Sequence, residues 1–118
     1  MPPKAKITRE MILDASVEIV RSCGHENLNA RAIAEHLKCS TQPILYNFRT
    51  VDEIREAVYR VADEYHSAYI MPEAGDESPL LAMGLNYVRF GHEEKNLFRF
   101  LFQTNQFGGM NMGALSGR

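Results

Sequence analysis

The sequence predicts an all-α protein, and three observations support that prediction. Apolar residues recur at steps of three and four along most of the chain, which is the spacing of one helix face. The strict apolar–polar alternation of strands is almost absent, and no Asn-Gly or Asp-Gly hairpin pair occurs. Capping residues, glycine and proline fall between the periodic stretches, where helices begin and end. We therefore expect six helices and no sheet.

Composition fits one ordinary domain of 118 residues, 45% of them hydrophobic, which can bury a core without a disulfide or a metal. The net charge of −2 argues weakly against nucleic-acid binding, but the charge is unevenly distributed. Residues 1–60 contain nine Lys and Arg and eight Asp and Glu, whereas residues 61–118 contain four and seven, so the first half is mildly positive and the second negative. The two cysteines form no disulfide framework or zinc spacing, which favours a reducing, cytoplasmic setting. We expect no secretion signal and no membrane partner, because no apolar run approaches roughly 20 residues.

The first expected helix spans residues 9–23. Thr8 suits its N-cap, and Gly24 suits the left-handed position that follows a helix end. Residues 25–28 are interpreted as a link. The expected buried stripe of this helix is Ile12, Ala15, Ile19, Val20 and Cys23.

Two short helices follow, over residues 30–37 and 41–47, with a turn at 38–40. Asn29 is the expected cap of the first and Ser40 of the second. Their expected buried residues are Ile33, Ala34, Leu37, Ile44 and Phe48. This pair has the spacing of a helix-turn-helix unit, in which the second helix is offered to the major groove of DNA.

A long helix is predicted over residues 51–69, because Thr50 and Glu53 have the spacing of a capping box. Its expected buried stripe is Val51, Ile54, Val58, Val61 and Tyr65. Residues 72–76 are the clear linker. The expected domains are therefore a helix-turn-helix head at 1–50, a linking helix at 51–71 and a second α-helical unit at 72–118.

The second unit begins with a helix that has Ser78 as its cap and Pro79 as its first residue. A sixth helix is expected over residues 93–103. The expected buried residues of these two helices are Leu81, Leu85, Val88, Leu97, Phe98, Leu101 and Phe102. Residues 104–118 hold four glycines and no lasting period, so we expect them to be poorly ordered or irregularly packed.

The order of these features resembles the N-terminal pattern of the TetR family of transcriptional regulators over about residues 8–60. The residues that carry the resemblance are Ile12, Ala15, Gly24, Asn29, Ile33, Ala34, Ser40, Phe48 and Ile54. Residues 96–98 also resemble the start of that family's second domain. The family usually has Tyr at Leu45, Lys near Val51 and Gly at Lys38. Its members are commonly longer, so the resemblance implies that residues 72–118 are an incomplete ligand-binding and dimerisation domain.

The resemblance implies a sequence-specific DNA-binding regulator, most naturally a ligand-responsive repressor that acts as a homodimer in its full-length form. Its implied partners are a double-stranded DNA operator and a small-molecule effector, with no cofactor. The alternative is a helical protein-interaction module that does not bind DNA. An enzyme is not expected, because the sequence has no Gly-rich phosphate loop, no nucleophile beside a plausible base and no pair of carboxylates spaced for catalysis.

Helix-turn-helix chemistry divides the expected DNA contacts into two layers, phosphate contacts for register and base contacts for sequence. The expected phosphate contacts are the free N–H groups at Val51, together with Lys4, Lys6, Thr8, Lys38, Tyr46 and Arg49. The expected base contacts are Arg31, Thr41, Gln42, Pro43 and Tyr46, with Asn47 as a further candidate. Thr41, Gln42 and Asn47 are equally good capping and turn residues, so that interpretation stays open.

Other side chains are weaker candidates. An effector cavity between the long helix and the next two helices is a hypothesis for Tyr65, His66, Tyr69 and Tyr87. The four histidines have no paired metal spacing, so no metal site is expected. Cys39 is expected to be buried, and Phe98, Phe100, Phe102 and Phe107 are expected to belong to the core.

Overall fold

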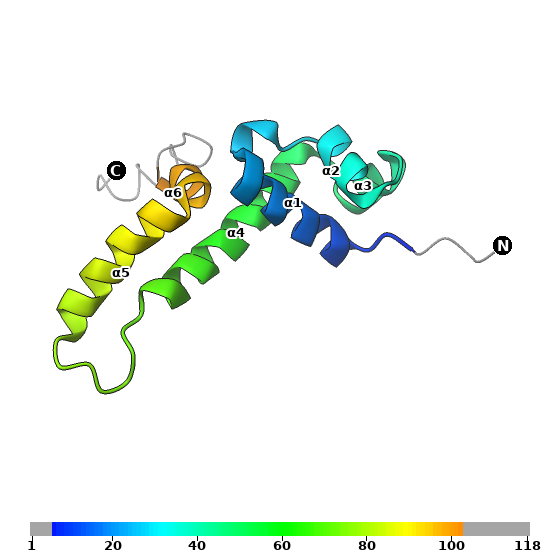
Figure 1. The fold of residues 1–118 in the computed structure, drawn as a ribbon. Helices are drawn as coiled ribbons and strands as arrows, with labels where there is room; N and C mark the ends of the chain where they lie inside the picture. Colours follow the sequence, from blue (N-terminus) through cyan, green and yellow to red (C-terminus); the bar gives the residue numbers. More distant parts are fainter. Residues whose placement is uncertain (1–5, 103–118) are drawn as a thin grey trace, which may run out of the picture.

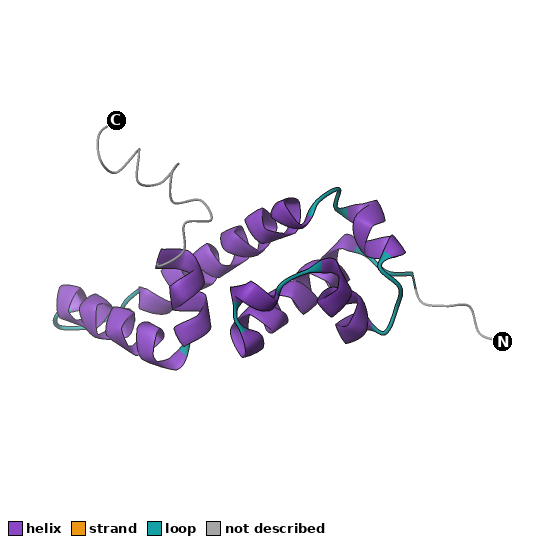
Figure 2. Cartoon of the chain, turned by 90° about the horizontal axis from the view of Figure 1, so that it is seen from above, coloured by secondary structure: helices purple, strands orange, loops and turns teal. Residues whose placement is uncertain are grey.

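The computed structural model describes residues 6–102, and within them the chain forms six α-helices and no strand (Figures 1 and 2). The elements are α1 (Arg9–Cys23), a 3₁₀ turn η1 (His25–Asn27), α2 (Ala30–Leu37), α3 (Gln42–Asn47), α4 (Val51–Ile70), α5 (Pro79–Glu93) and α6 (Lys95–Phe102). The all-α prediction is confirmed. The predictions for Lys4, Phe107 and residues 104–118 lie outside the described residues.

Three helices begin where their caps were expected. The side chains of Thr8, Asn29 and Thr50 each accept a hydrogen bond from the backbone N–H three residues on, at 3.1, 2.8 and 3.1 Å. Each bond satisfies an N–H group that has no partner inside the helix. The bounds predicted for α1 and α2 are confirmed to the residue, and α4 ends one residue later than predicted.

The cap predicted for α3 is wrong. This helix begins at Gln42, so the N-cap position falls on Thr41 and not on Ser40. Thr41 already has helical backbone angles (φ −74°, ψ −14°), and no side-chain hydrogen bond caps the helix. Pro43 stands within the first turn, where a missing N–H costs nothing. Ser78 holds the N-cap position of α5, as predicted, but its side chain makes no cap hydrogen bond.

The core of the head follows the predicted pattern closely. Its fully buried side chains are Ile12, Val20, Ile33, Ile44, Phe48 and Ile54. Leu28, interpreted as part of a link, is also buried, because η1 turns the chain back across the end of α1. Cys23 was predicted to be buried but is exposed at the last position of α1. Cys39 is half-buried against the core.

Gly24 ends α1 in an extended conformation of positive φ (φ 96°, ψ 154°), not in the left-handed helical conformation that was predicted. That region is open essentially to glycine alone. A Cβ built here would lie 2.5 Å from the Glu26 carboxylate. The glycine signal was therefore correct in position and wrong in conformation.

The buried face of α4 differs from the predicted one in its second half. Ile54 and Val58 are buried as expected, but Ala62 and His66 continue the buried row in steps of four. Tyr65, the predicted last member, is 40% exposed. The row shifts because the first half of α4 packs on the head and the second half packs on α5 and α6 (Figure 1).

The apolar stripe predicted for α5 is wrong. Leu81, Leu85 and Val88 are 63%, 56% and 69% exposed, and only Phe90 of this helix is buried. The helix faces α4 with the opposite side, from which Asn86 donates a hydrogen bond to the Ile70 carbonyl at 3.3 Å. In α6 the buried residues are Leu97, Phe100 and Leu101, while Phe102 is 46% exposed against prediction and Phe98 is half-buried.

The second unit folds back so that α6 lies against the end of α1 (Figure 1). The Arg21 guanidinium pairs with both carboxylate oxygens of Glu94, at 3.2 and 2.6 Å. The Asn96 amide donates to the Arg21 carbonyl at 2.8 Å, and Arg99 pairs with Glu26 of η1. The head therefore touches the second unit through α6 as well as through α4. Among residues 6–102, no helix combines the length and apolarity needed to cross a membrane.

Candidate nucleic-acid interface

The recognition-helix candidate α3 is anchored on one side and open on the other. Ile44 and Phe48 are 0% exposed and fix the helix to the head. Tyr46 is 87% exposed, and Gln42 on the same helix is also exposed. Leu45, where the TetR family usually has Tyr, is 48% exposed. A rigid short helix thus holds an aromatic ring and an amide in solvent, which is how a base-reading helix presents its side chains.

The turn before α3 is closed by Lys38 in the left-handed helical conformation (φ 57°, ψ 47°). Its N–H donates to the Glu35 carbonyl at 3.2 Å, and the Cys39 N–H donates to the Ala34 carbonyl at 2.9 Å. These bonds satisfy the free carbonyls at the end of α2. A glycine would fit this position without strain, whereas Lys38 adopts the left-handed conformation at a steric cost.

Arg9 links the start of α1 to the end of α3, and sequence reasoning missed it. Its guanidinium donates to the Asn47 carbonyl at 2.8 Å and lies 4.0 Å from the centre of the Phe48 ring. No local sequence pattern points to this contact, because Asn47 lies 38 residues away along the chain.

A hollow of about 460 Å³ lies between the N-terminal arm and α3. The predicted contact residues that line it are Lys6, Gln42, Pro43, Tyr46 and Asn47, together with Ile7. The structure therefore brings five of the predicted contacts to one surface. Two hydrogen-bonding side chains are partly engaged elsewhere. The Asn47 amide donates to the Pro43 carbonyl at 2.8 Å, and the Thr8 hydroxyl caps α1.

The remaining predicted contacts are exposed but do not line that hollow. They are Arg31 on α2, Lys38 and Thr41 in the turn region, and Arg49 after α3. Within the described part of the chain, Arg31, Lys38 and Arg49 take part in no ion pair. Three exposed cations without an ion-pair partner among the described residues are therefore found on α2, in the turn before α3 and just after α3, although the whole chain carries a net charge of −2. This local distribution suits contacts to phosphate.

The predicted anion site at the start of α4 is only partly open. Thr50 accepts the Glu53 N–H through its side chain and the Ile54 N–H through its carbonyl. The N–H groups of Val51 and Asp52 have no acceptor among the described residues and remain available to a phosphate. The carboxylates of Asp52 and Glu53 in the same turn oppose an anion there.

The chain matches no family model, no curated protein and no solved structure in comparisons with known proteins. The resemblance therefore stands on the quoted residues alone.

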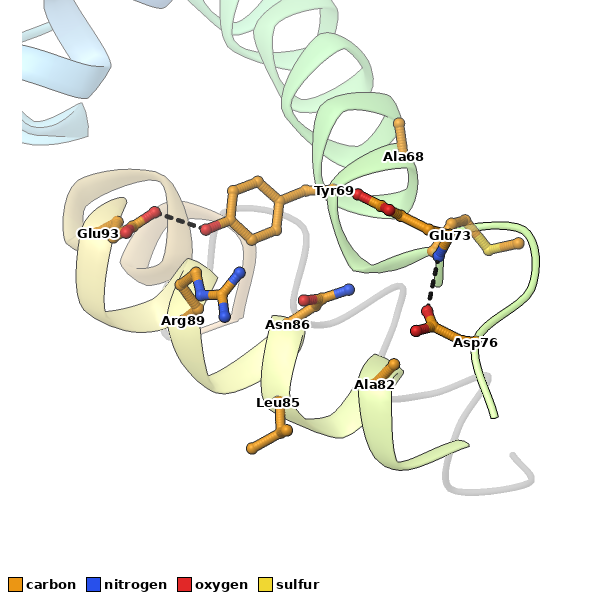
Figure 3. A pocket seen from close by; sticks show the side chains of 10 residues that line it. Ala68, Tyr69, Glu73, Asp76, Ala82, Leu85, Asn86, Arg89 and Glu93 are labelled. Carbon is orange, nitrogen blue, oxygen red and sulfur yellow. Dashed lines mark hydrogen bonds between the residues drawn. The ribbon is translucent and has the colours of Figure 1, made fainter. Parts of the chain in front are cut away.

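The second candidate site is an open hollow of about 750 Å³ between the end of α4, the linker and α5 (Figure 3). The Tyr69 hydroxyl donates to Glu93 across it at 2.6 Å, and this bond raises the pKa of Tyr69 to about 12. The Glu73 N–H donates to the Asp76 carboxylate at 2.9 Å on the linker side, and Arg89 also lines the hollow. The lining thus offers carboxylates, one guanidinium and apolar walls.

Of the four residues of the effector-cavity hypothesis, Tyr69 lines this hollow. Tyr65 instead donates to Glu94 at 3.4 Å. His66 is 6% exposed and sits among aromatic rings, with centroids 5.4 Å from Tyr87, 4.7 Å from Phe90 and 5.1 Å from Phe102.

The His66 ring is buried without its full set of hydrogen bonds. Its Nε2 atom has no hydrogen-bond partner among residues 6–102, and burial lowers the pKa of His66 below its ordinary value. Among residues 6–102, no group of three or more His, Cys, Asp and Glu side chains gathers as a metal site would require. His66 is therefore an incompletely hydrogen-bonded member of the junction between α4, α5 and α6.

Proposed function

We propose that this chain is a sequence-specific DNA-binding transcriptional regulator of helix-turn-helix type. The observation that carries the proposal is the setting of Tyr46, which is 87% exposed on a helix pinned by two fully buried neighbours. Thymine methyls and sugar edges provide an apolar surface on which an exposed aromatic ring at this position can pack. The cations around α3 suit the flanking phosphates.

The two layers of contact are proposed as follows. Lys6, Lys38 and Arg49 contact phosphates, with the open N–H groups at the start of α4 as a further anchor. Gln42 reads adenine through two hydrogen bonds, and Arg31 reads guanine in the same way. Each such base contact discriminates by roughly 1–3 kcal/mol.

The regulator is proposed to act as a ligand-responsive repressor and as a homodimer, with two copies of α3 entering successive major grooves. The hollow between α4 and α5 is the proposed effector site, and residues 72–118 form part of an effector and dimerisation unit. An effector alters DNA affinity only if it binds one of two conformations better than the other. The contacts of α6 with α1 and of α4 with the head provide two routes for that coupling.

The test is selection of bound sequences from a pool of random duplexes, followed by anisotropy titrations of the best duplex at rising salt. The affinity should fall steeply with salt as counterions compete. Arg31→Ala and Tyr46→Ala should weaken binding to the selected duplex, with a loss for Arg31→Ala of about 1–3 kcal/mol. Arg60→Ala is the matched control, because Arg60 is an exposed arginine of α4 that pairs only with Glu56 one turn away.

Two outcomes would sink the proposal or its details. A chain that binds no duplex even at low salt is not a DNA-binding protein, and the exposed face of α5 would then favour a protein-interaction module. Duplex binding that neither Arg31→Ala nor Tyr46→Ala weakens more than the control places α3 outside the groove.

A further inference from the structure

The outer side of α3 exposes three neighbouring side chains and no charge. Gln42, Leu45 and Tyr46 stand at positions i, i+3 and i+4, so they are neighbours on one face of the helix. All three are exposed, Leu45 by 48% and Tyr46 by 87%. Residues 41–48 include no Asp, Glu, Lys or Arg. Gln42, Leu45 and Tyr46 are called the α3 outer face below.

The α3 outer face carries the chemical groups that recognise A·T pairs. In the major groove, guanine is read by Arg or Lys side chains that donate to O6 and N7, and cytosine by Asp or Glu side chains that accept from N4. An amide such as that of Gln42 matches adenine, and an apolar side chain matches the C5-methyl group of thymine. The face therefore offers one partner for adenine, two apolar surfaces for thymine and none of the charged side chains that read G·C pairs.

The cations next to α3 lie at its two ends and not on its outer face. Lys38 lies in the turn before the helix, and Arg49 follows the helix; both are exposed. Neither takes part in an ion pair with another described residue. Cations at both ends of an uncharged, partly apolar face match a groove that is bordered by phosphates and has thymine methyl groups on its floor.

We propose that the α3 outer face reads a run of A·T pairs by their thymine methyl groups, and that Leu45 determines this specificity together with Gln42 and Tyr46. Recognition of guanine is left to Arg31 of α2. The specificity rests on the proposed DNA binding and adds to it the base composition of the recognised site and a contact for Leu45. Each thymine methyl group that is buried against the face should strengthen binding about fourfold.

Uracil in place of thymine tests the proposal, because uracil lacks the C5-methyl group and keeps the hydrogen-bonding groups of thymine. Duplexes that the full chain selects from a random pool are remade with deoxyuridine at one thymine at a time, and the dissociation constant of each is measured by fluorescence anisotropy. At each thymine that faces α3, uracil should weaken binding about fourfold. At thymines outside the recognised site, uracil should leave the dissociation constant unchanged.

The ratio of the dissociation constants for the uracil and thymine duplexes separates recognition from folding. A variant that only destabilises α3 weakens binding to both duplexes equally and keeps the ratio, and circular dichroism reports its helix content. Leu45→Ala should bring the ratio to about one at the thymines that Leu45 contacts. Leu45→Met should keep the ratio, because methionine is apolar and of similar volume. Arg31→Ala is the control, which should weaken binding to both duplexes and leave the ratio unchanged.

Three results would overturn the proposal while DNA binding stands. They are G·C pairs at the positions whose base preference changes in Gln42→Ala or Leu45→Ala, uracil that weakens binding at no position, and a ratio that Leu45→Ala leaves unchanged. A chain that selects no duplex at all overturns the proposed function and this specificity with it, so the two kinds of failure are distinct.

Discussion

Arg9→Met removes the guanidinium that ties the start of α1 to the end of α3 and keeps most of the aliphatic stem. The lost contacts are the hydrogen bond to the Asn47 carbonyl at 2.8 Å and the stacking on Phe48 at 4.0 Å. Stacking of this kind contributes about 0.5–1 kcal/mol at exposed sites. The charged hydrogen bond adds about 1 kcal/mol after allowance for its exposure. Removing a cation from the first turn returns about 0.3–0.5 kcal/mol through the helix dipole.

The net expectation for Arg9→Met is a fall of about 1–1.5 kcal/mol in the free energy of unfolding, measured by urea denaturation. For a chain of 118 residues each kcal/mol lowers Tm by about 4 °C. Binding to the selected duplex should weaken several-fold, because α3 loses one of its supports. The salt dependence of binding should not change, since Arg9 positions the helix and does not itself neutralise a phosphate.

Two controls and two contrary results define this test. Arg9→Lys keeps the charge without the planar stack and should show an intermediate loss. Arg60→Met removes an exposed arginine elsewhere and should stay within about 0.5 kcal/mol of wild type. Wild-type stability in Arg9→Met would show that the contact with α3 contributes nothing. A salt slope lowered by about one would make Arg9 a phosphate contact instead.

Three further predictions follow from the geometry. Lys38→Gly should raise the free energy of unfolding by about 0.5–1 kcal/mol, because the left-handed conformation costs an L-residue about 1–2 kcal/mol; a urea midpoint that does not rise refutes the strain. Burial lowers the pKa of both His66 and His25 from 6.5, so the unfolded chain binds more protons below that pH. The free energy of unfolding should therefore fall as pH drops from 6.5 toward the folded pKa values. His66→Phe should reduce the slope of the free energy of unfolding against pH; a slope that this substitution leaves unchanged assigns the effect to His25. A double-mutant cycle on Arg21 and Glu94 should give a coupling of about 0.5–1 kcal/mol that shrinks in about 1 M salt, because the Arg21 side chain is 41% exposed although that of Glu94 is only 15% exposed; a coupling that salt does not change contradicts the exposure of Arg21.

The starts of α1, α2 and α4 could be predicted because they depend on neighbours in the sequence, whereas the sixth helix begins at Lys95 and not at residue 93 as predicted, because Glu93 ends α5. A hydroxyl or amide at Thr8, Asn29 or Thr50 meets an N–H only three residues away, so the cap works in any tertiary context. The residue at which α3 begins was not predicted in this way. Thr41 adopts helical angles because the left-handed Lys38 has already turned the chain, and no side-chain signal marks that geometry.

The buried faces of α4 and α5 could not be predicted from spacing alone. The sequence of α4 fits two overlapping rows, and the partners α5 and α6 select the one with Ala62 and His66. In α5 the strongest apolar stripe is the one left exposed, while Phe90 and a polar Asn86 face α4. Hydrophobic periodicity shows which face of a helix is apolar, but it does not show whether another element of the same chain packs on that face.

The sequence predicted which side chains of the candidate site are exposed, but it did not predict the contact that holds them in place. Gln42 and Tyr46 are exposed on α3, as a reading helix needs. Arg9 was missed because its partners lie 38 residues away along the chain, a separation that no local pattern encodes.

The ion pair between Arg21 and Glu94 changes how the proposed ligand response would reach DNA. With α4 as the sole connection, a ligand between α4 and α5 would act only by tilting that helix. Glu94 lies between α5 and α6 and pairs with Arg21 of α1. A shift of α5 would therefore also displace α1, the helix that carries Arg9. Arg9 in turn contacts α3 at Asn47. The second unit and the recognition helix are thus joined through α1, with one contact near each end of that helix, and loss of either arginine should weaken the response to ligand more than it weakens ligand binding.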